Sequence, residues 1–68
     1  MSTLEEMGNL MRAMPGPDAG VDEVADWYRR KAHLLDRLAE DAAGTESVRM
    51  HTQADLARRH AAELVAVT

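Results

Sequence analysis

A hydroxyl, an imidazole and a carboxylate recur at intervals of four residues in the C-terminal third of the chain, at Ser47, His51 and Asp55. These side chains could act as a nucleophile, its base and the group that orients the base. Such catalysis also requires an exposed nucleophile on a bent segment, an oxyanion hole and a pocket, whereas a straight helix offers only a polar stripe. We therefore expect a surface pair of His51 with Asp55, a capping role for Ser47 or Thr45, and no enzyme.

Metal and cofactor chemistry has equally little support. His51 and Asp55 could share an ion, but His60 follows His51 by nine residues, about 900° of helical rotation, and so points to the opposite face. The chain has no Cys, which excludes disulfides and cysteine zinc sites. "GPDAG" lacks the Lys and the preceding strand of a phosphate-binding loop. We expect no cofactor, and we expect His60, between Leu56 and Leu64, to be buried or half-buried.

The densest group of ionic and aromatic residues is "WYRRKAHLLDRL", residues 27–38, which contains the only Trp, Tyr and Lys of the chain. A heptad pattern points Arg29 and Arg30 to water, and a dimer could join them to Arg58 and Arg59 in a nucleic-acid contact. No helix-turn-helix unit accompanies these residues, and a net charge of −4 attracts polyphosphate weakly. A DNA-associated regulator or antitoxin-like dimer is therefore the alternative function, and nucleic acid is not the favoured partner.

The same segment belongs to a longer amphipathic helix with an apolar seam. Its heptads place Val24, Lys31 and Leu38 at d, Tyr28 and Leu35 at a, Trp27 and Leu34 at g, and Ala25, Ala32 and Ala39 at e. Small residues at every seventh position allow a neighbouring helix to approach closely. Lys31 either fixes the register of the seam or lies at its edge. On the outer side, four-residue spacing predicts ion pairs of Asp26 with Arg30 and of Arg37 with Asp41.

Local signals divide the chain into three helices within one domain, residues 1–68. The capping box "STLE" begins a helix over about 3–13, and Pro15 ends it. "PGPDAG", residues 15–20, is a stiff linker to a helix over about 21–43. A third helix over about 46–66 follows the short Gly44-Thr45 connection, with a later start or a kink possible at Thr52. We predict an all-α fold, in which a short helix precedes a long antiparallel hairpin.

Large apolar side chains are too few for an ordinary self-sufficient core. Seven Leu and five Val stand without any Ile or Phe, and a chain of 68 residues is near the lower size limit of a stable domain. We therefore predict a homo-oligomer, a dimer in which two hairpins form a four-helix-type bundle. The predicted oligomer or partner interface comprises Met7, Met11, Met14, Val24, Trp27, Tyr28, Lys31, Leu35, Leu38, Leu56 and Leu64.

Methionine is concentrated in the N-terminal helix, where Leu4, Met7, Met11 and Met14 form one stripe beside Leu10. Methionine side chains are flexible and polarizable, and they suit both gap filling in a core and adaptable contacts with a partner. The stripe therefore predicts either a core helix or a detachable recognition helix that lies in a groove of a partner or of the dimer mate.

The function expected from these features is a non-enzymatic protein-protein interaction module, a small regulatory or adaptor subunit with a protein partner still to be identified. The longest apolar run is far below the ~18 residues that span a bilayer, and the N-terminus carries Glu5 and Glu6 where a signal peptide is basic. We expect a cytoplasmic location and no membrane association. Seven Arg against one Lys, with abundant Ala, is typical of a GC-rich bacterial genome.

Overall fold

The chain folds into three helices in a computed structural model, which describes residues 2–66. The helices are α1 (Thr3–Arg12), α2 (Val21–Asp41) and α3 (Gly44–Ala66), and the described residues contain no strand. The predicted all-α hairpin is thereby confirmed. α1 ends one residue and α2 two residues earlier than predicted, while α3 begins two residues earlier. Met1, Val67 and Thr68, which belong to the predicted single domain, lie outside the described residues.

The helix ends follow the local chemistry of the sequence. The Ser2 hydroxyl accepts a hydrogen bond from the Glu5 amide at 3.1 Å, which caps the first turn of α1. Gly44 has a φ of +59°, a conformation that favours glycine, and this allows the chain to reverse between α2 and α3. The Thr52 hydroxyl donates to the Val48 carbonyl one turn earlier, so α3 is continuous there. The alternative start at Thr52 is wrong.

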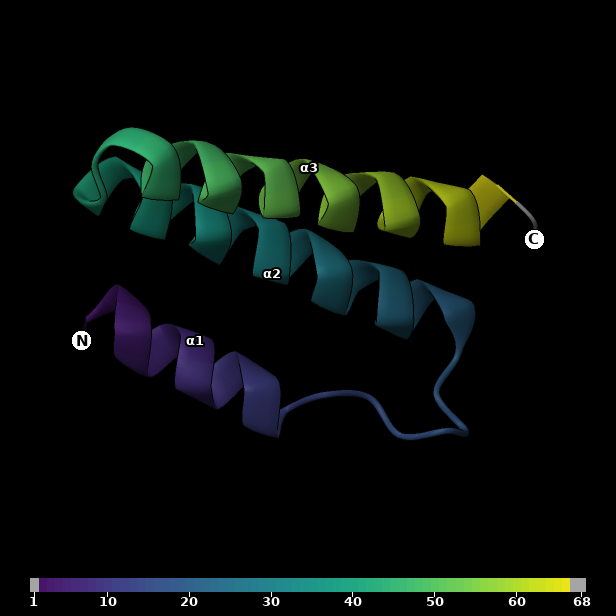
Figure 1. The fold of residues 1–68 in the computed structure, drawn as a ribbon. Coiled ribbons are helices and arrows are strands. Elements are labelled where there is room, and N and C mark those ends of the chain that lie inside the picture. The colour runs from purple at the N-terminus through teal and green to yellow at the C-terminus, as the bar shows by residue number, and fades with distance from the viewer. Residues whose placement is uncertain (1, 67–68) are drawn as a thin grey trace.

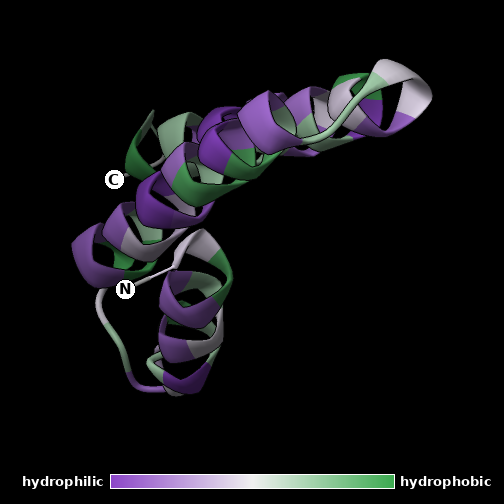
Figure 2. Ribbon diagram, turned by 90° about the vertical axis from the view of Figure 1, so that its left-hand side faces the viewer, coloured by the Kyte–Doolittle hydropathy of each residue, from purple (hydrophilic) through white to green (hydrophobic). Residues whose placement is uncertain are grey.

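The three helices lie side by side with α2 in the middle (Figure 1). α2 and α3 form the antiparallel hairpin, α1 runs antiparallel to α2 on its other side, and no contact joins α1 to α3 within residues 2–66. The Cα atoms span only 14 Å in the thinnest direction, against 37 Å and 24 Å in the others. Hydropathy colouring shows hydrophobic and hydrophilic positions interspersed along each helix, as in amphipathic helices with a wet side (Figure 2).

Alanine forms the interface between α2 and α3. The buried side chains at this interface are Ala25, Ala32 and Ala39 of α2 and Ala54, Ala57 and Ala61 of α3. Since an alanine side chain extends no further than Cβ, the two backbones can pack closely along the whole hairpin. Tyr28 and Leu35 pack against this seam from its side. The predicted row of small residues at e is therefore the most buried part of α2, as expected.

α1 is held against α2 by a small cluster of larger side chains. Leu10, Trp27 and Leu34 are buried together, with Met7 and Tyr28 packed against them. The Trp27 indole donates a buried hydrogen bond of 2.8 Å to the Leu10 carbonyl, which ties the last turn of α1 to the second turn of α2. Trp27 is therefore core, as its place on the packing side of the helix predicted.

The methionine stripe is only partly used in this packing. Met7 is half-buried, but Met11 and Met14 are 45% and 55% exposed, and Leu4 is 71% exposed. The side of α1 that faces α2 centres on Leu10, so it is rotated away from the stripe that the sequence suggested. Within the described residues, Met7 alone among Met7, Met11 and Met14 belongs to the core.

The alanine seam can be tested by overpacking. Ala32→Leu adds a branched side chain where Ala32 is 0% exposed, and should lower the free energy of unfolding by about 1–3 kcal/mol. Ala62→Leu makes the same change at an exposed position of α3 and should alter stability by no more than about 0.5 kcal/mol. Urea unfolding followed by circular dichroism measures both. Equal effects of the two substitutions would contradict the close packing of α2 and α3.

Candidate functional site

One broad side of the helical layer is apolar. On α2, half-buried Val24, Tyr28, Lys31, Leu35 and Leu38 follow helical spacing between the alanines that meet α3 and the Trp27–Leu34 stripe that meets α1. Members from the flanking helices are Met7 and Met11 of α1 and Leu56 and Leu64 of α3. We call this set of nine residues the apolar face.

The residues around Leu56 of α3, and those across α1 from Met7 and Met11, show which side of the layer these three side chains occupy. Leu56 lines a surface hollow together with Tyr28 and Lys31, which places it beside the α2 stripe. On α1, Glu6 and Asn9 border a groove on the opposite side of the layer, so Met7 and Met11, across the helix from them, lie with Tyr28. Of the predicted interface residues, Trp27 is absent from the face because α1 covers it, and Met14 lies beyond the end of α1.

Lys31 is the only formally charged residue of the apolar face. Its ammonium nitrogen lies 5.6 Å from the centroid of the Trp27 ring, within the range of a cation–π contact. The side chain thus folds down over the indole, and its methylenes cover apolar surface. The sequence left two roles for Lys31, fixing the register of the seam or lying at its edge. In the single chain Lys31 lies at the edge, since no other helix covers it within residues 2–66.

His60 borders the same face but is not buried. Its ring meets the edge of Tyr28 at a centroid distance of 4.6 Å, and Tyr28 in turn meets Trp27 at 5.1 Å. The expectation of a buried or half-buried His60 is wrong because α3 packs through its alanines, which leaves His60 and Leu56 exposed at the edge of the interface. The result is a short row of three rings across α2 and α3.

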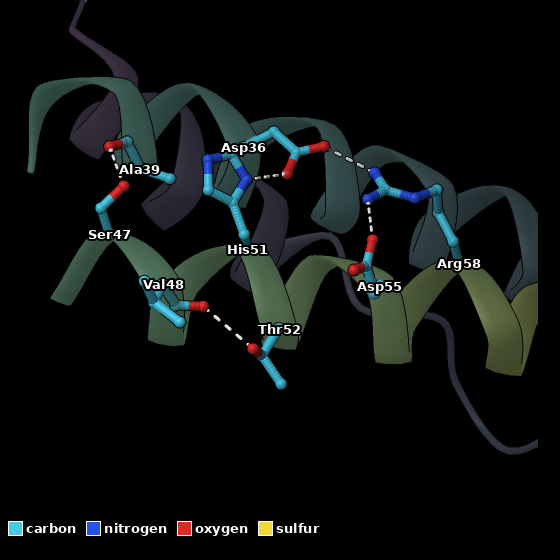
Figure 3. A network of polar contacts seen from close by, with 8 residues as sticks. All are labelled: Asp36, Ala39, Ser47, Val48, His51, Thr52, Asp55 and Arg58. Atoms are coloured by element: carbon cyan, nitrogen blue, oxygen red, sulfur yellow. Dashed lines mark hydrogen bonds and ion pairs between the residues drawn. The ribbon is translucent and has the colours of Figure 1, made fainter. Parts of the chain in front are cut away.

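The opposite side of the layer is charged, and it holds the α2–α3 hairpin together with a polar network (Figure 3). The Asp36 carboxylate accepts a hydrogen bond of 2.6 Å from Arg58 and lies 2.9 Å from Nδ1 of His51. Arg58 also donates to Asp55 in the preceding turn, and the Ser47 hydroxyl donates to the Ala39 carbonyl at 2.9 Å. The polar stripe of α3 thus connects α3 to α2.

This network corrects the sequence interpretation of Ser47, His51 and Asp55. The three side chains do not bond to one another: each has its partner elsewhere, on α2 or on Arg58. The predicted surface pair of His51 with Asp55 is wrong, and Ser47 bonds to the last turn of α2 and does not cap α3. The stripe has a structural role.

The electrostatics of Asp36 fit that role. Hydrogen bonds from Arg58 and then His51 lower the pKa of the Asp36 carboxyl below its usual value of 3.8. The hydrogen bonds of Arg58 to Asp36 and then to Asp55 raise the pKa of the guanidinium. Asp36 therefore stays ionised near neutral pH, as an ion-pair partner does and a general acid does not.

The arginines of the predicted nucleic-acid contact differ in their surroundings, and the contact itself stays a prediction. Arg59 is exposed on α3. Arg58 is occupied by Asp36 and Asp55, whereas Arg29 and Arg30 border the groove between α1 and α2. The predicted intrahelical pairs are also wrong. Arg37 lies 2.9 Å from Glu6 of α1 in place of Asp41, and Arg30 forms no ion pair with Asp26.

Cofactor and membrane features are equally sparse in the described region. No three His, Asp or Glu side chains between residues 2 and 66 are grouped to hold a metal ion. Over the same residues, no helix combines the length and hydrophobicity needed to cross a bilayer. Comparisons with protein-family models, curated proteins and solved structures returned no match.

The Asp36 network predicts a pH-dependent contribution to stability. A depressed carboxyl pKa stabilises the folded chain above the unfolded pKa, and this stabilisation is lost as the pH falls through the folded value. Asp36→Asn should therefore lower the thermal midpoint at pH 7 by a few degrees at most, since the network is partly solvated. The difference from the parent protein should vanish well below pH 3.8.

Glu63→Gln is the matched control, because Glu63 is exposed on α3 and has no ion pair in the described part of the chain. It should not change the thermal midpoint between pH 2 and pH 7. Thermal scans of the three proteins across this range provide the measurement. If the Asp36→Asn protein is as stable as the parent at pH 7, the network does not stabilise the hairpin.

Proposed function

We propose that this chain is a non-enzymatic protein-protein interaction module, a small regulatory or adaptor subunit that works as a homodimer through its apolar face. The observation that carries the proposal is the single layer of helices. Amphipathic helices are stable when their apolar stripes are covered, and domains generally use at least two packed layers to do this. In one copy, nothing within residues 2–66 covers the apolar face.

The burial pattern supports this interpretation. Within residues 2–66, six of the nine buried hydrophobic residues are alanines, which contribute little area, and the large ones are Leu10, Trp27 and Leu34. On the apolar face, by contrast, Met11 and Leu56 are 45% and 48% exposed, and the α2 stripe is half-buried. A second layer against this face would bury more large side chains than the chain buries alone.

A second copy is the simplest occupant. A two-fold axis parallel to the layer, lying in the interface, would bring the apolar faces of the two copies together, with the two α2 helices near its centre. The pairing joins two hairpins as four helices and adds α1 of each copy at its sides. Lys31 would bring a charge to this interface, where the Trp27 ring, 5.6 Å from its ammonium nitrogen, offers a cation–π contact.

A DNA-associated regulator remains the second candidate, with less geometric support. It would draw on Arg29 and Arg30, which are exposed and form no ion pair among the described residues. Arg58 is already committed to two carboxylates.

The dimer is tested by a charge placed on the apolar face. Leu56→Glu changes a side chain that is 48% exposed in one copy, so the single chain should still fold. At a dimer interface the buried carboxylate should weaken self-association at least about tenfold. Val48→Glu, at a position 65% exposed on the outer side of α3, is the matched control and should leave association unchanged.

Sedimentation equilibrium measures the masses, and circular dichroism verifies the helix content of both variants. The parent protein should also unfold at a temperature that rises with its concentration. A parent protein of monomer mass, with a thermal midpoint independent of concentration, would contradict the dimer. Equal weakening by both variants would place the interface elsewhere.

A further inference from the structure

A groove runs between α1 and α2 on the charged side of the layer, opposite the apolar face. It has a volume of about 630 Å³, within the range of ordinary ligand sites. We call it the cationic groove. Its lining residues are Arg29, Arg30, His33, Leu34 and Arg37 of α2, and Glu6, Asn9, Leu10 and, just after the helix, Ala13 on the α1 side.

The charge of this groove is opposite to that of the chain. Three arginines line it against the single carboxylate of Glu6, although the protein as a whole carries a net charge of −4. Arg37 is engaged by Glu6 at 2.9 Å, at one end of the groove. Arg29 and Arg30 are exposed and have no carboxylate partner within residues 2–66. Two guanidinium groups are therefore available to bind carboxylates, bidentately where the geometry allows.

The length of the positive stretch limits the anion that fits. Arg30 and Arg37 are seven residues apart on one face of α2, which is about 10 Å along the axis. The same face carries Asp26 one turn before Arg30, and Glu40 one turn after Arg37. These carboxylates would repel a long polyanion such as duplex DNA, whereas a compact anion bound at Arg29 and Arg30 would not extend over Asp26 and Glu40 together.

The shape and the apolar part of the lining narrow the ligand further. Leu10 and Leu34 contribute apolar surface between the charged walls, and the groove is open to solvent along one side. A site for a small molecule usually encloses most of its ligand, whereas an open groove suits a peptide segment that shows its other side to water.

We propose that the cationic groove binds a short acidic segment of a partner protein. Carboxylates of the segment pair with Arg29 and Arg30, and an aliphatic side chain packs on Leu10 and Leu34. The proposal rests on the proposed interaction function and deepens it, because it assigns partner binding to the side of the layer that dimerisation leaves open.

The test uses a fluorescein-labelled amphipathic peptide with Leu and Glu at helical spacing, and a control peptide with Gln at every Glu. Fluorescence anisotropy with the full-length parent protein should show binding of the Glu peptide that weakens as salt is added. The Gln peptide should bind at least about tenfold more weakly, since its neutral amides replace charge-assisted bonds.

Two protein variants locate the binding. Arg30→Glu reverses one charge of the groove and should weaken the Glu peptide at least about tenfold. Arg59→Glu makes the same change at an exposed position of α3, outside the groove. It should alter the affinity for the Glu peptide less than about threefold. Both positions are exposed, so both variants should fold. Equal loss in the two variants, equal binding of the two peptides, or no binding of the Glu peptide at low salt would overturn the proposal.

A duplex DNA of matched charge completes the set. The acidic-peptide proposal would be overturned, and the DNA-associated function favoured, by two results together. The parent protein would bind DNA more tightly than the Glu peptide, and Arg30→Glu would weaken DNA binding at least about tenfold. Peptide binding can be tested separately from dimerisation, because Leu56 lies on the apolar face and the cationic groove lies on the opposite side of the layer.

If Leu56→Glu is monomeric and still binds the Glu peptide, both proposals hold. If the parent protein is monomeric and binds it, only the dimer fails.

Discussion

The central helix α2 has to satisfy two neighbours that do not touch each other. On one side its alanines allow α3 to approach closely, and on another Trp27 and Leu34 hold α1. Because no contact joins α1 to α3 in the described residues, no third helix closes the arrangement into a bundle. The layer therefore has two open sides. These two sides differ in chemistry: one is apolar, and the other carries the polar network and the cationic groove.

The hairpin was predictable because its signals are local and periodic. The alanine row at every seventh residue predicted the α2–α3 contact, and glycine at position 44 marked the turn. The apolar stripe of α2 also lies where its heptad pattern indicated. Each inference uses one helix at a time, and helical geometry fixes which residues share a side.

The position of α1 and the polar pairs could not be predicted this way because they depend on contacts distant in sequence. The hydrogen bond from Trp27 to the Leu10 carbonyl joins residues seventeen apart, and it fixes a face of α1 that hydrophobicity alone misplaced. Likewise, four-residue spacing suggested a pair of His51 with Asp55, but the close helix packing brings Asp36 within hydrogen-bond distance of both His51 and Arg58. One sign was present in the sequence: Ser47, His51 and Arg58 share one face of the third helix, which suggests a common neighbour.

The proposed dimer requires that a second copy of the chain cover the apolar face. Isotope-filtered NMR of an equimolar mixture of ¹³C-labelled and unlabelled protein tests it directly, since only contacts between copies produce the filtered signals. The account predicts intermolecular signals among the methyl groups of Met11, Leu35, Leu38 and Leu56. Signals confined to residues of the cationic groove, or none in a sample that sedimentation shows to be monomeric, would contradict it.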